Sequence, residues 1–151
     1  MRFLLIVKAT PQSEHGEMPA DVERLMVDMG RFNDEMIAAG VLLDGAGLQP
    51  SSAGKRIRFK GLGHAVVTDG PFDNVSELAS GYWFLNCNDT DEALAWARRV
   101  PFSSGALELR PLAEPEAFAD LVSEEEVQKE RDHRAEPDRQ TAARRRPRRG
   151  D

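Results

Sequence analysis

The sequence predicts an α+β domain in which two helices cover one face of an antiparallel sheet. Residues 2–9 and 80–87 are apolar on both alternating faces, which is typical of central strands. Helical spacing of apolar residues follows each of them, at 19–40 and 89–100. Residues 106–112 alternate between apolar and charged side chains, as in a strand with one buried face. This order fits a ferredoxin-like sandwich.

The first strand and helix have clear limits. Both faces of residues 2–9 carry apolar side chains: Phe3, Leu5 and Val7 on one, Leu4 and Ile6 on the other. A polar loop is expected over 10–17. Pro19 suits the first turn of a helix, where a missing backbone N–H costs nothing, and Gly40 is expected to end that helix in the left-handed conformation.

The middle of the chain predicts a broken strand and a hairpin. Residues 41–43 begin a strand that the glycine-rich stretch 44–47 is expected to interrupt as a bulge or bend. Gly61-Leu62-Gly63 joins two β-favouring runs, 55–60 and 64–68, as a hairpin does. The basic face of the first arm is either a solvated strand face or a surface for an anionic ligand: Arg56, Arg58 and Lys60.

Capping signals organise the C-terminal half. Asp89 with Glu92 predicts the start of the second helix, and Pro101 its end. A helical turn at 115–121 and a charged helix from Ser123 to about Arg134 follow. The composition changes at residue 136, so we expect a domain at 1–121, a helical extension at 122–135 and a disordered basic tail at 136–151.

Charge and composition exclude several classes of function. From Lys129 onward there are nine basic and five acidic residues, so the net charge of −6 leaves −10 on residues 1–128. Such an acidic domain is a poor nucleic-acid binder, which leaves only the basic tail for that role. The single cysteine predicts no internal disulfide and a cytoplasmic protein. The three histidines lack the spacing of metal ligands, so no metal or cofactor site is expected. No apolar run is long enough for a membrane helix, and a signal peptide is not expected.

The most informative stretch is Thr68-Asp69-Gly70-Pro71-Phe72. Asp69 can accept a hydrogen bond from its own turn, Gly70 tolerates any φ, and Pro71 fixes the exit of the chain. The turn is either a functional site or only a well-made turn. As a site, it predicts a small-ligand module in which Asp69 and Glu77 are the polar groups of one cleft; the expected ligand-binding residues are Phe72, Tyr82, Trp83 and Arg110.

Other readings remain open. Tyr82 and Trp83 are alternatively explained by core or dimer packing. The chain is alternatively an enzyme in which Asp69 or Glu77 is the general base, or a regulatory protein whose acidic domain or basic tail binds a transcription factor. The apolar face of strands 2–9 and 80–87 that two helices cannot cover predicts a homodimer, with the sheet of a second copy over it.

Several segments in the correct order resemble the YCII-related family in its DGPF-containing branch, over residues 1 to about 121: Met29-Gly30-Arg31-Phe32-Asn33-Asp34-Glu35, Ala39-Gly40-Val41-Leu42-Leu43, Gly47-Leu48-Gln49-Pro50, Thr68-Asp69-Gly70-Pro71-Phe72, Asp91-Glu92-Ala93-Leu94-Ala95-Trp96 and Leu107-Glu108-Leu109-Arg110-Pro111-Leu112. The resemblance implies a dimeric α+β barrel of ferredoxin-like protomers. It also implies relatives of mostly unknown function, some resembling small lyases or dehydrochlorinases, and an association of this branch with sigma factors.

Two departures from the family pattern bear on function. Ser76 stands where the family usually has a lysine, although Glu77 is kept. The histidine that enzyme-like relatives carry near the first helix has no match, because His15 lies in the loop before Pro19. A histidine–aspartate dyad is therefore not expected.

Overall fold

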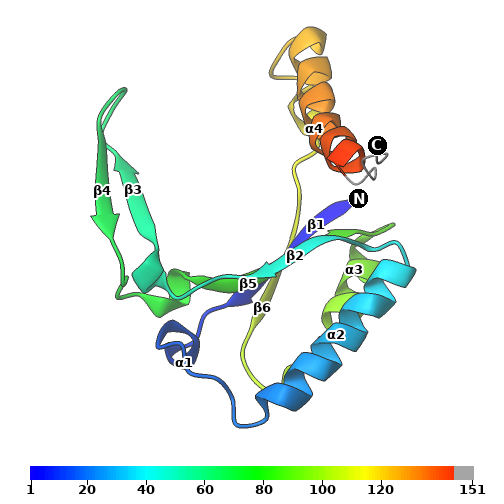
Figure 1. Cartoon of the computed structure of the whole chain (residues 1–151). Coiled ribbons are helices and arrows are strands. Elements are labelled where there is room, and N and C mark those ends of the chain that lie inside the picture. The colour runs from blue at the N-terminus through cyan, green and yellow to red at the C-terminus, as the bar shows by residue number, and fades with distance from the viewer. Residues whose placement is uncertain (145–151) are drawn as a thin grey trace, which may run out of the picture. The chain divides into compact units, whose positions relative to one another are not determined.

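The structure is a computed structural model that describes the backbone of residues 1–144 and the side chains of residues 1–135. The chain divides into two compact units, Met1–Leu112 and Ala113–Asp151. The first contains a four-stranded sheet with the order β2-β5-β1-β6 and a separate two-stranded sheet, β3-β4 (Figure 1). The strands of the larger sheet are β1 (Arg2–Lys8), β2 (Leu42–Gly47), β5 (Ala79–Asn86) and β6 (Leu107–Pro111).

All neighbours in the larger sheet are antiparallel, and β1 and β5 occupy its centre. Without the inserted hairpin, this strand order is that of a split β-α-β sandwich of the ferredoxin type. The predicted α+β class and the two central strands are therefore confirmed. Their runs of apolar residues on both faces reflect this central position.

Helices α2 (Val22–Ala38) and α3 (Thr90–Ala97) lie on one side of the sheet (Figure 1). Alternate side chains of β1 and β5 meet them in the core, where the largest fully buried residues are Phe3, Leu5, Met36 and Leu85. Cys87 is 5% exposed, and burial raises the pKa of its thiol. It is thus the small buried hydrophobe that its apolar context predicts.

The ends of both helices follow from their capping residues. Gly40 has φ +70°, and Val41 N–H donates to the Met36 carbonyl at 2.9 Å, which is the bond pattern of a Schellman cap. The predicted Gly40 cap is confirmed. Asp89 caps α3 by accepting from Glu92 N–H at 2.8 Å, also as predicted. Helix α2 begins at Val22, three residues after Pro19, which was expected to be its first residue.

One short helix was not predicted from the sequence. Helix α1 (Pro11–Glu14) lies inside the stretch expected to be a polar loop. Thr10 caps it by accepting from Ser13 N–H at 3.2 Å, and the Ser13 hydroxyl oxygen accepts from Thr10 N–H at 2.9 Å. Thr10 followed by Pro11 was the signal available in the sequence. The capping box was hard to recognise, because its third helical residue is serine and not the usual glutamate.

The strand was expected to be interrupted at 44–47, and that position is wrong. Strand β2 continues through Gly47, and its register shift lies earlier, between Leu42 and Asp44. Gly45 keeps the strand regular because it lies against the Trp83 indole. A Cβ there would be 2.9 Å from Trp83 Cδ1 and 3.2 Å from the Tyr82 carbonyl oxygen. Here glycine permits close approach instead of breaking the strand.

The predicted hairpin is confirmed as β3 (Lys55–Phe59) and β4 (Ala65–Asp69). Gly61 and Gly63 at its tip have φ +109° and +76°, which glycine adopts without a steric penalty. The hairpin forms its own two-stranded sheet and stands out from the larger sheet, on the side away from α2 (Figure 1).

The second unit contains the 3₁₀ turn η3 (Pro115–Phe118) and helix α4 (Glu124–Arg144). Arg131 forms an ion pair with Glu116 at 2.6 Å, and Val127 is 7% exposed. The unit begins at Ala113, and α4 ends at Arg144. The expected boundary at 121 and the expected disorder of the tail at 136–151 stay predictions. The remainder of that tail, 145–151, lies outside the described residues. Within the described part, no helix is long and apolar enough to span a bilayer.

The contact between Gly45 and Trp83 yields a matched pair of variants. Gly45→Ala should lower the free energy of unfolding by about 1 to 3 kcal/mol, the usual cost of overpacking. Gly47→Ala on the same strand has no atom within 4 Å of the added Cβ and should change it by less than about 0.5 kcal/mol. Urea unfolding of both variants measures the difference. Equal stabilities would show that the strand does not rest on the indole.

Candidate functional site

The Asp69–Phe72 turn is locked onto a short 3₁₀ segment, η1 (Ser51–Ala53). A Cβ at Gly70 would lie 1.7 Å from the Ser51 carbonyl oxygen, so no other residue fits without a backbone shift. Gly70 N–H donates to the Gly54 carbonyl at 3.0 Å, and Phe72 N–H donates to Ser51 Oγ at 3.1 Å. The glycine of this motif is thus explained by packing between two backbone segments.

The two carboxylates expected at this turn are bound to neighbours and face solvent. Asp69 accepts a charged hydrogen bond from Lys55, and its side chain is 75% exposed. Glu77 accepts from Asn74 Nδ2 at 2.8 Å and is 61% exposed. A carboxylate serves best as a general base when burial removes its hydration. This environment is unlike that of a general base.

A shallow cavity of about 410 Å³ adjoins the turn, lined by Leu48, Pro50, Phe72, Glu77 and Leu78 among others. Its only other carboxylate, Glu14, accepts hydrogen bonds from the backbone and the hydroxyl of Ser51. The Phe72 ring lies under the Arg56 guanidinium, with Arg56 Cζ 4.2 Å from the ring centroid. These contacts attach the turn to its neighbours at the base of the hairpin.

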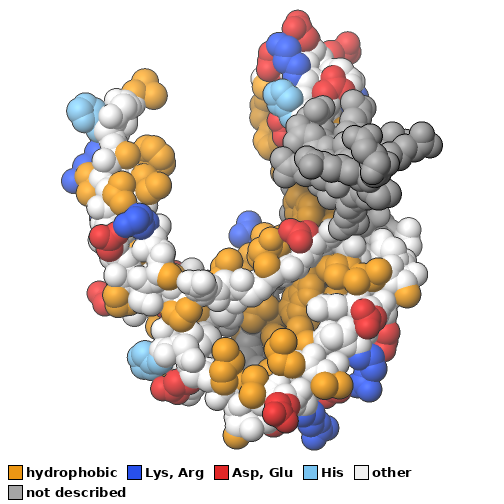
Figure 2. Space-filling model, viewed as in Figure 1, with side chains coloured by type: hydrophobic (Ala, Val, Ile, Leu, Met, Phe, Trp, Pro, Cys, Tyr) orange, Lys and Arg blue, Asp and Glu red, His pale blue; other side chains and the backbone are white. Residues whose placement is uncertain are grey.

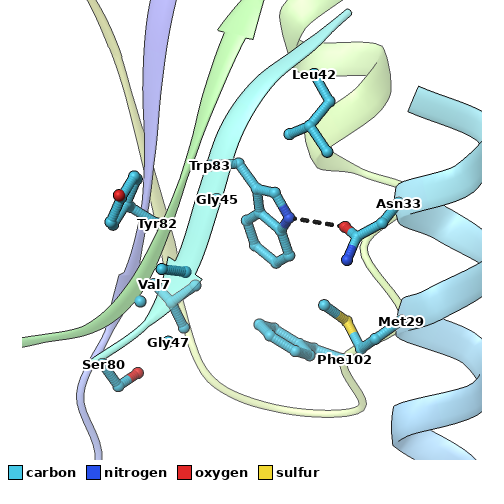
Figure 3. A pocket seen from close by; sticks show the side chains of 12 residues that line it. Val7, Met29, Asn33, Leu42, Gly45, Gly47, Ser80, Tyr82, Trp83 and Phe102 are labelled. Carbon is cyan, nitrogen blue, oxygen red and sulfur yellow. Dashed lines mark hydrogen bonds between the residues drawn. The ribbon is translucent and has the colours of Figure 1, made fainter. Parts of the chain in front are cut away.

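A second cavity, of about 330 Å³, lies between α2 and the sheet at its β2 edge. Aromatic and aliphatic side chains form most of its wall: Val7, Met29, Leu42, Trp83 and Phe102. Figure 3 shows Trp83, Phe102, Met29 and Asn33 directed toward the same space. None of the side chains that line this cavity is charged.

Asn33 is the principal polar group of this second cavity, and its orientation is fixed. Trp83 Nε1–H donates to Asn33 Oδ1 at 3.0 Å (Figure 3). Because an indole N–H only donates, the amide atom facing it must be the oxygen. The Asn33 NH₂ group therefore points elsewhere, and it has no hydrogen-bond partner within the described part of the chain.

The indole that holds Asn33 is itself immobilised. Trp83 is 6% exposed and packs edge-on against Phe32, with ring centroids 6.1 Å apart. Its centroid lies 6.2 Å from that of Phe102. Aromatic contacts of this geometry stabilise one ring orientation. The Asn33 NH₂ donor is thus positioned by a closely packed aromatic side chain.

The six expected site residues do not share one cleft. Phe72 and Glu77 line the shallow cavity, whereas Trp83 lines the one under α2. Figure 3 shows the Tyr82 ring on the opposite side of the sheet from Trp83, although Tyr82 also borders that cavity. Arg110 is on β6, where it pairs with Leu4 of β1, and its Nη1 lies 3.5 Å from Glu108 Oε1.

Sequence reasoning missed Asn33, Met29 and Phe102 as lining residues. Asn33 follows Met29 by four positions and therefore interrupts the apolar stripe of its helix, a signal that was available. Phe102 follows the helix-ending Pro101 and gave no such signal. In the part of the chain that the structure describes, no cluster of three or more His, Cys, Asp or Glu side chains is arranged to hold a metal ion.

The Tyr82 phenol, the only one in the chain, can be titrated without interference. It donates to Asp44 Oδ2 at 3.0 Å, and this bond and the Asp44 charge raise the pKa of Tyr82. Absorbance titration should give a midpoint above the usual value of about 10. The hydrogen bond stabilises the fold below that usual value, and its contribution is lost as pH rises through the raised pKa.

Asp44→Asn should move this midpoint back toward the ordinary range, because the charge is removed. Asp69→Asn, on the hairpin, is the control and should leave it unchanged. A midpoint that is the same in the wild type and in Asp44→Asn would contradict the assigned hydrogen bond.

Comparison with known proteins shows similarity to a bacterial protein and to a solved structure. An uncharacterized protein of Rhizobium meliloti (strain 1021) is 36% identical over 94 residues, which cover 60% of this chain and 75% of that protein. The solved structure of 5-chloro-2-hydroxyhydroquinone dehydrochlorinase from Burkholderia phenoliruptrix AC1100, in complex with 2,5-dihydroxybenzoquinone, matches 78% of this chain and 98% of its own, with 10% identity and a TM-score of 0.39. A similarity at that score says nothing about activity.

A family model gives the assignment. The model of the YCII-related domain matches residues 1–116, which contain the whole first unit with its sheet, both helices and the hairpin. The expected family is thereby confirmed. The chain is a member of the YCII-related family.

Proposed function

We propose that this protein binds a small planar ligand with an acceptor oxygen in the cavity between α2 and the sheet. The observation that supports this most strongly is the Asn33 amide, whose oxygen accepts from Trp83 while its NH₂ group has no hydrogen-bond partner among the described residues. Ligand pockets typically combine apolar walls with a few fixed polar groups, and this cavity has that composition.

The cavity also restricts the class of ligand. Its volume of about 330 Å³ is at the small end for ligand sites, so a single-ring compound fits best. Because no charged side chain lines it, an anion would lose its hydration without gaining a partner charge. The favoured ligand is a neutral ring with a carbonyl oxygen, such as an aromatic ketone, an amide or a quinone.

Binding is favoured over catalysis. The lining residues include no carboxylate, imidazole or thiol that could serve as a base or nucleophile. Asp69 and Glu77 are outside this cavity and largely exposed. No contact in the described residues supports the alternative of a lyase or dehydrochlorinase that uses either carboxylate as its general base.

Asn33→Asp tests the ligand site selectively. The aspartate oxygen still accepts from Trp83, but the NH₂ donor is lost and a negative charge faces the ligand. In a thermal-shift screen with acetophenone, benzamide and benzoate, wild type should be stabilised by the neutral compounds. The variant should bind them at least about tenfold more weakly, corresponding to about 1.4 kcal/mol.

Asp69→Asn at the turn is the matched control and should bind these compounds as the wild type does. If Asp69→Asn loses binding while Asn33→Asp keeps it, the ligand site is the turn. If no neutral ring compound binds, the proposed ligand class is wrong.

We further propose that two copies pair through the sheet face that α2 and α3 leave uncovered, forming a dimeric α+β barrel. Four half-buried apolar side chains occupy the middle of that face: Leu4, Ile6, Tyr82 and Phe84. Face-to-face packing of two sheets would bury them at the usual spacing of about 10 Å. Charged side chains of β6, Glu108 and Arg110, flank this patch.

Phe84→Lys should disrupt this pairing, because it places a charge in the middle of the apolar face. We expect sedimentation equilibrium to give a wild-type dimer and at least a hundredfold weaker association for the variant, or about 2.8 kcal/mol. Asn86→Lys places the same charge on the same face but at an exposed position, and should remain dimeric. A wild-type monomer would refute the proposed dimer.

A further inference from the structure

The β3–β4 hairpin, here called the arm (residues 55–69), exposes more apolar surface than a free hairpin should. Its large apolar side chains are between 45% and 102% exposed: Ile57, Phe59, Leu62, Val66 and Val67. An isolated two-stranded hairpin is at best marginally stable in water. Both of its strands also have an unpaired edge, which is a template for contact with another chain.

The exposed residues are arranged as a face. Ile57 pairs with Val67, and Phe59 with Ala65, so these four side chains project from one side of the arm. Leu62 extends the apolar surface to the tip, where it is fully exposed. Figure 2 shows hydrophobic side chains gathered along the arm, toward the uncovered side of the sheet. A contiguous apolar face of this kind marks an interaction surface.

The base of the arm is held firmly. Lys55 and Asp69 are paired across its two strands, and Arg56 stacks on Phe72 of the turn. Gly70 packs directly on the Ser51 carbonyl, where a Cβ would lie 1.7 Å from the oxygen. These contacts join the Asp69–Phe72 motif to the first unit at the point where the arm begins.

Three observations identify the partner as a second copy of this chain. First, the arm rises on the side of the sheet away from α2, the side on which a second sheet would lie (Figure 1). Second, its five-residue strands at about 3.3 Å per residue reach about 17 Å, beyond the spacing of about 10 Å between packed sheets. The arm would thus run alongside the second copy.

Third, the charges are complementary. The arm contains four basic residues and one acidic residue, whereas the rest of residues 1–112 contains seven basic and fourteen acidic residues. Arg58 and Lys60 form no ion pair in the described part of the chain, but they lie on the face of the arm opposite Ile57 and Phe59. Their charge therefore attracts an acidic partner over a distance and not within the apolar contact. Such complementarity favours contact between the arm and the main body of another copy.

We infer that the arm of each protomer packs its Ile57–Phe59 face against the flank of the second copy's sheet. This inference rests on the proposed dimer but adds an interface distinct from the open sheet face. It assigns the Asp69–Phe72 turn a mechanical role in assembly.

The test is the double variant Ile57→Thr/Phe59→Thr, measured by sedimentation equilibrium. Threonine is β-branched and favours strands, and both positions are more than half exposed in the single chain, so the protomer should fold as before. The dimer dissociation constant should rise at least about tenfold, since two buried side chains are truncated at the interface. Val66→Thr, on the opposite face of the arm, is the control and should stay within about twofold of wild type.

Hydrogen exchange on the unmodified chain provides a second measurement that does not depend on a variant's folding. Arm amides should exchange more slowly at concentrations where the dimer forms than after dilution. If wild type is dimeric but the double variant and the arm amides are unaffected, the arm inference is wrong and the open-face dimer stands. If wild type is monomeric, both fail, and another protein becomes the candidate partner of the arm.

Discussion

The fold depends on how the Trp83 indole is enclosed. On one side, the edge strand approaches it at Gly45, where any side chain would clash. On the other, Phe32 packs against the ring and Asn33 accepts its N–H. One residue of a central strand thereby joins β5, the edge strand and α2, and the same contacts leave the cavity beside it. Stability and the proposed ligand site thus share one side chain.

The Asp69–Phe72 turn has a different role from the one its composition first indicates. An acid, a glycine, a proline and an aromatic ring in succession are as typical of a binding loop as of a rigid turn. In the structure, the acid pairs with Lys55, the glycine contacts Ser51 and the ring stacks under Arg56. Each group is satisfied by a neighbour within the protein. The turn therefore packs against its neighbours at the base of the hairpin, and the polar group proposed to bind a ligand is on α2.

Two surfaces of the first unit expose apolar side chains to solvent: the uncovered sheet face and the arm. They have one physical cause. Two helices cover only one side of a four-stranded sheet, and the inserted hairpin is too short to fold back and form a core of its own. In the proposed dimer, a second copy would supply the missing layer for both surfaces at once. The cavity proposed to bind a ligand, by contrast, lies on the helical side, and one chain supplies the residues that line it.

The sequence by itself determined the fold class, because periodicity, capping residues and glycine positions are local signals. It located β1, β5, the hairpin and the Gly40 cap, and the motifs that identified the family. It could not locate the cavity, since Asn33 becomes significant only when Trp83, fifty positions away in the chain, takes its amide oxygen. Nor could it distinguish a glycine that breaks a strand from one that admits an indole, as at Gly45. Only the tertiary structure decided these points, because each depends on which distant side chains meet.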